Sequence, residues 1–226
     1  KLWCCLMTLE LKKRIITSFF LFFLLILMFF YTFVMIISVT IIAIITWIEF
    51  YALISKIFSK KNNNDKFYRF LYKVISLLYL SALIYLFLVT KSKYPELNIV
   101  LIYAILVSIV TDIGGLAVGK VFKGKKLTKI SPNKTISGAM GSFIFSLFLI
   151  PFFIDYFIGY EILTLLIITL FISLVSQIGD VFISFIKRKA KVKDTSDILP
   201  GHGGFLDRID GIIFAIPAGF LLFNYL

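Results

Sequence analysis

Acidic residues, histidine and cysteine are all scarce in this chain of 226 residues. Aspartate and glutamate together number 12 against 24 lysines and arginines, and the chain has one histidine and two cysteines. The cysteines are the neighbours Cys4 and Cys5, a spacing that rarely allows pairing, so no disulfide framework is expected. So few histidine and cysteine side chains also argue against a zinc site.

Charged residues of either sign make up 16% of the chain, whereas hydrophobic residues make up 60% and the mean hydropathy is +1.01. A soluble domain of this length cannot bury so much apolar surface, because its water-facing positions need polar side chains. The composition therefore predicts an all-α polytopic membrane protein. The opening apolar run is too long for a cleavable signal peptide, and the stretch from Met7 reads more like a natural start than residues 1–6 do.

The first long apolar run, residues 15–48, contains no charged residue over 34 positions. As a helix it would measure roughly 50 Å, whereas one crossing needs about 30 Å, so it holds either one steeply tilted span or two short ones. Further spans are expected near residues 70–90, 98–119, 136–154, 161–186 and 211–226.

The distribution of basic residues favours two spans in that first run. With a hairpin there and a cytoplasmic N-terminus, 22 of the 24 lysines and arginines fall on the cytoplasmic side, in residues 1–14, 55–73, 120–134 and 187–210. The positive-inside rule therefore predicts about seven spans with the N-terminus in the cytoplasm. The net charge of +12 has an ordinary explanation in this topology, because basic loops fix the orientation of a membrane protein and contact anionic lipid. For the basic segment 55–73 this explanation is one of two equal alternatives, and nothing there indicates a nucleic-acid partner.

Two aspartates stand inside predicted spans, where carboxylates are costly and usually mark function. Asp112 precedes Lys120 by eight residues and Asp180 precedes Lys187 by seven, so each is expected roughly 10–12 Å inside the cytoplasmic end of its span. The alternative is a buried acid neutralised by protonation or by a nearby lysine.

A polar stripe accompanies Asp180. Gln177, Asp180, Ser184 and Lys187 follow steps of three and four residues, which places them on one helix face. The stripe indicates the wall of a wet groove, although Gln177 and Ser184 alone are more typical of interhelical hydrogen bonds.

The basic stretch 119–141 contains Lys134 and Thr135 just before a predicted helix that starts with small residues. A helix N-terminus beside lysines is suited to binding an anion, but an ordinary basic loop with a threonine cap fits equally well.

The segment LPGHGGFLDRID, residues 199–210, gathers glycines, the single histidine and two aspartates. Gly203 and Gly204 allow close approach of the backbone to a ligand, and the i, i+3 spacing of Asp207 and Asp210 allows both to point the same way. Oxygen ligands of this kind indicate Mg²⁺, and a second cation is not excluded. Nearby basic side chains, among them Arg188 and Arg208, would bind phosphate. Together with the carboxylates and the metal ion they form a set of groups suited to phosphoryl or nucleotidyl transfer.

Residues 184–210, SFIKRKAKVKDTSDILPGHGGFLDRID, resemble the signature of the phosphatidate cytidylyltransferase family. Every fixed position of that signature is matched, and the blocks SPNKT at 131–135 and SQIGD at 176–180 occur in the expected order. The resemblance covers about residues 98–226, a catalytic membrane region that follows N-terminal spans over residues 1–90.

The resemblance implies condensation of CTP with phosphatidic acid to CDP-diacylglycerol and pyrophosphate, at the cytoplasmic side of a bacterial inner membrane, with Mg²⁺ as cofactor. The expected metal ligands are Asp180, Asp207, Asp210 and Asp112, and the expected catalytic residues are Asp180, Asp207, Arg208 and Lys187. The expected substrate-binding residues are Lys134, Thr135, Ser184, Arg188, Lys193, His202, Gly203 and Gly204. A CTP-dependent lipid kinase and a polytopic transporter are the alternatives, and a homodimer is left open.

Overall fold

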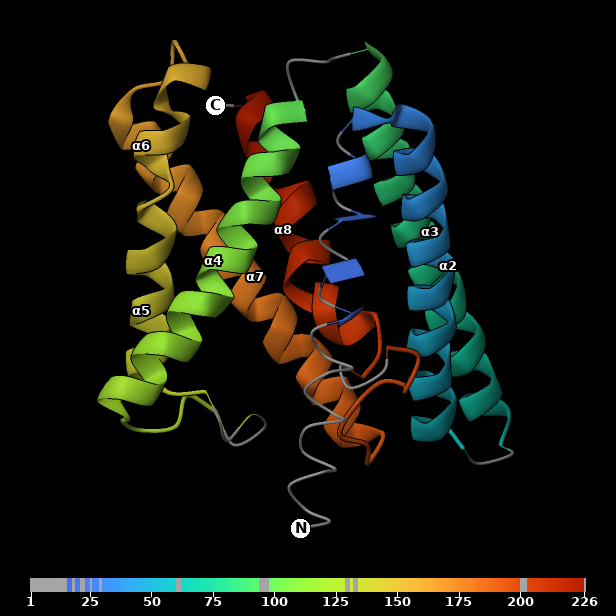
Figure 1. The fold of residues 1–226 in the computed structure, drawn as a ribbon. Coiled ribbons are helices and arrows are strands. Elements are labelled where there is room, and N and C mark those ends of the chain that lie inside the picture. Colours follow the sequence, from blue (N-terminus) through green and yellow to red (C-terminus); the bar gives the residue numbers. More distant parts are fainter. Residues whose placement is uncertain are drawn as a thin grey trace. The chain divides into compact units, whose positions relative to one another are not determined.

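The computed structural model describes residues 16–17, 19–20, 23–24, 26–28, 30–59, 62–93, 98–128, 131, 134–199 and 203–225. Within these residues the secondary structure is helical and contains no strand, only two isolated β-bridges. The elements are α2 (Thr32–Ile57), α3 (Asn63–Lys93), α4 (Asn98–Phe122), α5 (Ile136–Leu147), α6 (Ile150–Phe153), η2 (Ile154–Tyr156), α7 (Ile162–Lys189) and α8 (Leu206–Tyr225) (Figure 1). The prediction of an all-α chain is confirmed.

Five helical segments of the described chain are long and apolar enough to cross a membrane: Thr32–Ile57, Asn63–Thr90, Asn98–Phe122, Ile136–Tyr156 and Ile162–Lys189. Many of their large apolar side chains are exposed, as lipid-facing side chains are. The described residues between 16 and 30 are helical as well, and Tyr31 interrupts them with an extended backbone before α2 begins. The long charge-free run is therefore divided, as the two-span interpretation requires. The number of spans and the cytoplasmic N-terminus stay predictions.

The chain divides into two compact units, and the division interrupts the sequence. The first unit contains residues 1–88 and 189–208, and the second contains residues 89–188 and 209–226. Residues 189–208, which make up most of the signature, therefore group with the N-terminal helices. The division into N-terminal spans over residues 1–90 and a catalytic region over residues 98–226 stays a prediction.

In the first unit α2 and α3 lie side by side (Figure 1). The indole Nε1 of Trp47 donates to the carbonyl oxygen of Lys73 at 3.3 Å. The ammonium group of Lys73 lies over the rings of both Trp47 and Tyr51, at 5.3 and 5.2 Å from their centroids. An aromatic face attracts a cation. The contact therefore stabilises the charge of Lys73 and joins α3 to α2.

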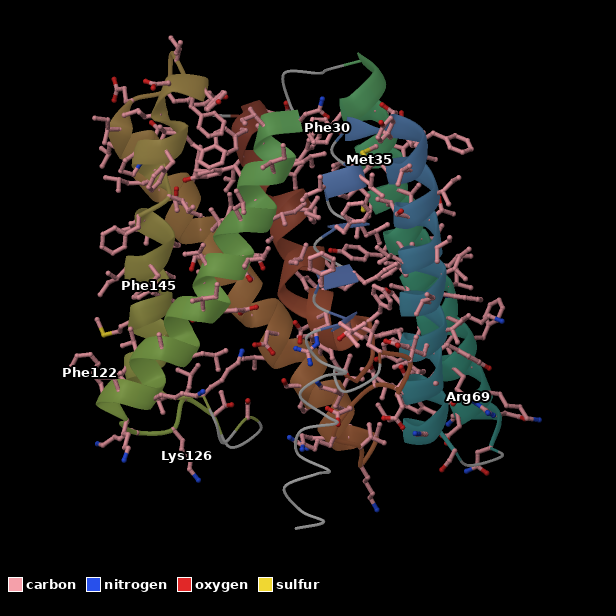
Figure 2. The ribbon with its side chains drawn as sticks, in the orientation of Figure 1. Phe30, Met35, Arg69, Phe122, Lys126 and Phe145 are labelled. Carbon is pink, nitrogen blue, oxygen red and sulfur yellow. The ribbon has the colours of Figure 1, made fainter. Side chains whose placement is uncertain are left out.

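In the second unit α4 and α5 approach each other through glycines. A Cβ at Gly141 would lie 2.4 Å from Cβ of Val118, and a Cβ at Gly138 would lie 2.7 Å from the carbonyl oxygen of Gly115. Helices in lipid gain little from the hydrophobic effect, so close backbone packing at small residues stabilises their contact. Figure 2 shows Phe122 at the end of α4, Lys126 on the segment beyond it and Phe145 on α5.

Hydroxyl groups join α4 to α7 in the interior of the same unit. The oxygens of three pairs lie 2.5–2.8 Å apart, and all six residues are buried: Tyr103–Thr169, Ser108–Ser176 and Thr111–Ser173. Helix α8 packs against both helices through Gly211, where a Cβ would lie 2.6 Å from Oγ of Ser176 and 3.1 Å from Oγ of Ser108. These contacts fix the relative positions of α4, α7 and α8.

Replacing Gly141 with leucine is expected to force α4 and α5 apart, because Val118 has no free space to accept a side chain. Overpacking of this kind costs about 2 kcal/mol, which lowers the Tm of a chain of this size by roughly 4–8 °C. Thermal unfolding in detergent measures the change. The neighbouring Met140→Leu is the control, since Met140 is exposed. Equal Tm values for the two variants would contradict the packing argument.

Candidate functional site

Three carboxylates from three helices gather in the second unit. Asp112 of α4, Asp180 of α7 and Asp210 of α8 lie within electrostatic range of one another, and Asp210 also lies within range of Lys187. Asp112 is exposed, Asp180 is partly buried and Asp210 is buried. The structure therefore places Asp112 and Asp180 near each other, as their similar depth in the sequence predicts, and adds Asp210 to them.

Close contact between α7 and α8 explains how Asp210 reaches this cluster. A Cβ at Gly179 would lie 2.4 Å from the ring of Phe214 and 2.9 Å from the carbonyl oxygen of Asp210, so the helices can meet only where α7 has no side chain. The carboxylate of Asp210 accepts a hydrogen bond from the backbone N–H of Gly211 at 3.0 Å.

Lys134 supplies a positive charge to this cluster by forming an ion pair with Asp180. Its backbone is held by an antiparallel bridge: the N–H of Leu127 donates to the carbonyl oxygen of Lys134 at 2.7 Å, and the N–H of Ile136 donates to that of Lys125 at 3.0 Å. One alternative for an acid inside a span is neutralisation by a nearby lysine. Lys134 is such a lysine for Asp180.

Thr135 caps α5, because its hydroxyl accepts from the N–H of Gly138 at 3.0 Å. This is the ordinary capping alternative for the basic loop, and it places Thr135 next to the lysine that meets Asp180. A phosphate-binding role for Lys134 and Thr135 stays a prediction.

Two members of the polar stripe of α7, Ser184 and Gln177, are weakly bonded or unbonded. The hydroxyl of Ser184 lies 3.4 Å from Oδ1 of Asp180, a long contact for a hydrogen bond. The side-chain nitrogen of Gln177 is buried and has no hydrogen-bond partner. An amide nitrogen of this kind costs free energy unless a ligand or solvent satisfies it, which suits a position at the wall of a binding site.

The signature segment is held within the first unit by Asp207. Its Oδ2 accepts from the backbone N–H of Thr195 at 2.8 Å, from the hydroxyl of Thr195 at 3.0 Å and from the N–H of Gly204 at 3.1 Å. The N–H of Leu199 also donates to the carbonyl oxygen of Gly203, whose φ of +80° is one that glycine adopts without strain. Asp207 therefore orders this loop in addition to any role at a metal.

Sequence reasoning missed Glu49, which contacts the same segment from α2. Its side chain is 2% exposed and accepts hydrogen bonds from Thr195, Ser196, Phe205 and Leu206. The signal was available: Glu49 is the first charged residue after a 34-residue charge-free run, and it precedes Lys56 by seven residues. Asp180 stands at the same spacing from its own lysine.

Of the remaining predicted cations, Lys187 and Arg188 lie at the end of α7 and Arg208 at the start of α8, whereas Lys193 lies in the segment between these helices. Arg188, Lys193 and Arg208 are exposed, and Lys187 is partly exposed. His202 lies outside the described residues. Arg208 and Asp207 belong to the first unit, whereas Asp112, Asp180, Asp210 and Lys187 belong to the second.

The donor chemistry of the second unit fits a hard cation. Within the described ranges, no three or more histidine, cysteine, aspartate or glutamate side chains already form a group that could hold a metal ion. The carboxylates of Asp112, Asp180 and Asp210 nevertheless repel one another and consist of oxygen donors, and no histidine or cysteine accompanies them among the described residues. This donor set suits Mg²⁺ rather than Zn²⁺.

The sequence is similar to several bacterial proteins named phosphatidate cytidylyltransferase. It is 43% identical to that of Staphylococcus haemolyticus (strain JCSC1435) over 122 residues, 52% of this chain and 46% of the relative. It is 44% identical to that of Bacillus subtilis (strain 168) over 117 residues, 51% and 44% of the two chains. For Rickettsia prowazekii (strain Madrid E) the identity is 39% over 155 residues, 65% of this chain and 66% of the relative.

The chain spans about half the length of the first two relatives. The model that describes the cytidylyltransferase family matches residues 5–226, which include both compact units. The chain therefore belongs to the cytidylyltransferase family.

Proposed function

We propose that this protein transfers the cytidylyl group of CTP to phosphatidic acid, giving CDP-diacylglycerol and pyrophosphate. The observation that carries the proposal is the cluster of Asp112, Asp180 and Asp210 beside Lys134 and Lys187, in a chain with the complete 184–210 signature. Carboxylates and fixed cations together suit a reaction between two phosphate-bearing substrates. The names of the relatives support CTP and phosphatidate as the substrate pair.

In the proposed reaction, a phosphate oxygen of phosphatidic acid attacks the α-phosphorus of CTP. A new P–O bond joins the two phosphates, the bond between the α- and β-phosphates breaks, and pyrophosphate leaves with that electron pair. The attacking phosphomonoester has a second pKa of about 6, so it is already mostly ionised at neutral pH. No strong general base is required, and His202 is not assigned one of these steps.

The residues of the chain bind and orient the substrates. Lys134, Lys187 and Arg188 neutralise phosphate oxygens, and Arg208 offers the planar pair of donors that matches a phosphate. Asp112, Asp180 and Asp210 supply the oxygen donors that we propose for Mg²⁺, although in the described residues they are not grouped closely enough to hold a metal ion. When bound, the cation supplies positive charge beside the pyrophosphate leaving group.

We place the reaction at the cytoplasmic face of a bacterial inner membrane. The carboxylates of Asp112 and Asp180 each precede the basic end of their own helix by about two turns, which is the depth of lipid headgroups. A water-soluble nucleotide and a lipid phosphate both reach that depth. A transporter would instead need polar groups near the midplane, and a lipid kinase is not among the names of the relatives.

The purified protein in detergent is expected to convert labelled CTP and phosphatidic acid to a lipid-linked cytidine and pyrophosphate, in a reaction that EDTA stops and Mg²⁺ restores. Thin-layer chromatography of the lipid and a pyrophosphate assay measure the two products. Replacing phosphatidic acid with diacylglycerol tests the lipid-kinase alternative. Formation of phosphatidic acid from diacylglycerol, without lipid-linked cytidine, would refute the proposal.

Asp180→Asn should leave a folded protein whose kcat is lower by on the order of 100-fold or more, because the cluster loses a charge aimed at the reacting groups. Asp155→Asn is the matched control, since Asp155 is an exposed acid of η2 and is expected to keep full activity. Size-exclusion profiles and Tm check folding. A near-normal kcat for Asp180→Asn would remove this residue from the site.

Arg208→Lys keeps the charge but loses the planar two-pronged contact, so kcat/KM for CTP should fall by roughly 10-fold. Arg69→Lys, at another arginine of the first unit (labelled in Figure 2), is expected to change nothing. Steady-state kinetics with varied CTP distinguish the two variants. An unchanged value for Arg208→Lys would restrict Arg208 to orienting the chain in the membrane.

A further inference from the structure

Glu49 is the charged residue of α2 that the proposed function leaves unexplained. It stands in the apolar part of the helix, and its side chain is 2% exposed. An ionised carboxylate buried in apolar surroundings costs several kcal/mol unless donors satisfy it. The groups around Glu49 must therefore include hydrogen-bond donors for its carboxylate.

Four donors satisfy the two oxygens of Glu49. The backbone N–H of Phe205 lies 3.0 Å from Oε1 and that of Leu206 lies 2.8 Å from Oε2. The hydroxyl of Ser196 donates to Oε1 at 2.5 Å, and that of Thr195 lies 3.0 Å from Oε2. A carboxylate only accepts, so it suits four donors in a way that a neutral amide of the same size does not.

Two of these donors belong to the start of α8, which begins at Leu206. The first N–H groups of a helix have no partner within the helix, and they favour a negative charge. Glu49 therefore caps α8 from a residue about 150 positions earlier in the chain. The cap determines where α8 begins, and the next two residues of α8 are Asp207 and Arg208.

Thr195 connects this cap to Asp207. Its hydroxyl lies 3.0 Å from Oε2 of Glu49 and 3.0 Å from Oδ2 of Asp207, so a single proton is shared between two carboxylates. A shift of Glu49 must therefore move Thr195, and with it the hydrogen bonds that hold Asp207.

Gly204 shows how closely these groups are packed. A Cβ at this position would lie 1.9 Å from Oγ1 of Thr195 and 2.7 and 2.8 Å from the two oxygens of Glu49. The sequence predicts that Gly204 makes room for a ligand, whereas in this structure the space beside Gly204 is filled by Thr195 and Glu49.

We propose that Glu49 is a positioning residue of the cytidylyl transfer, an inference that rests on the proposed function. It holds Thr195, Ser196 and the first turn of α8 in the conformation that presents Asp207 and Arg208 to the phosphates. It contacts no reacting atom itself. Its effect on the reaction passes through the backbone N–H groups of Phe205 and Leu206 and through the hydroxyl of Thr195.

Glu49→Gln tests the proposal in two independent measurements on the full chain. Hydrogen exchange of the backbone amides of residues 203–208 should accelerate at least 10-fold, while exchange in α5 stays the same. The kcat for cytidylyl transfer should fall at least 10-fold, with the KM for CTP changed less than threefold. The control is Glu161→Gln, the same change at an exposed glutamate, which should leave both measurements at the wild-type value.

Hydrogen exchange does not depend on activity, so the two hypotheses fail separately. An inactive wild-type chain would refute the proposed function, and the exchange data would still test whether Glu49 holds this segment. Unchanged exchange in Glu49→Gln overturns the inference. Faster exchange with a wild-type kcat overturns it as well, because Glu49 would then stabilise the loop without positioning the reaction.

Thr195→Val is the second variant, in case Glu49→Gln does not fold. Valine keeps the shape of threonine but removes the proton shared by Glu49 and Asp207. We expect a threefold to 10-fold lower kcat and faster exchange in residues 203–208. A kcat and exchange rates equal to those of the wild type would show that the connection between Glu49 and Asp207 has no part in the reaction.

Discussion

A carboxylate in an apolar span must be given hydrogen-bond donors or an opposite charge, and the rest of this structure depends on how that requirement is met. Glu49 is satisfied by donors from the signature segment and Asp180 by the ammonium group of Lys134, whereas Asp210 accepts a hydrogen bond from the N–H of Gly211. The donors of Glu49 and the ammonium group of Lys134 lie far in the sequence from the acids that they contact. Glu49 and Asp180 therefore contact segments that are distant in the sequence, and these segments carry residues of the family blocks, Phe205 and Leu206 for Glu49 and Lys134 for Asp180.

Close helix packing in the second unit accompanies each of the three clustered acids, Asp112, Asp180 and Asp210. Gly114 follows Asp112 by two positions, Gly179 immediately precedes Asp180 and Gly211 immediately follows Asp210. At each of these glycines a neighbouring helix approaches so closely that a Cβ would lie under 3 Å from one of its atoms. Because each acid is one or two residues from such a contact, it cannot move away from the neighbouring helix. The contacts at Gly179 and Gly211 thus hold the helices of Asp180 and Asp210 against each other, and the contact at Gly114 holds α4 against α5.

The sequence predicts the helical class and an interruption of the first apolar run, because composition and helix length decide these features. The depth of Asp112 and Asp180 in a membrane stays a prediction. The sequence does not predict the partners. Nothing in the pattern around Lys134 distinguishes an anion site from an ion pair with Asp180, and the capping role of Thr135 was one of two equal alternatives. Glu49 was missed although the intramembrane-acid rule applies to it, because its donors lie about 150 residues later and two of them are backbone groups. Backbone N–H groups are present in every residue except proline, so no residue type in the sequence indicates that they act as donors to Glu49.

The ion pair between Lys134 and Asp180 has a consequence for the proposed reaction. If a phosphate binds Lys134 without a cation, the carboxylate of Asp180 loses its counter-charge. If a cation binds Asp180 without a phosphate, the ammonium group of Lys134 loses its counter-charge. Breaking such a pair by removing one partner costs about 3–5 kcal/mol when the charges are buried, and less here because both side chains retain some exposure. A nucleotide that arrives together with its cation replaces both partners at once and avoids that cost. In the proposed reaction the pair thus favours a complete, charge-compensated substrate over either of its components, and without substrate Lys134 compensates the charge of Asp180.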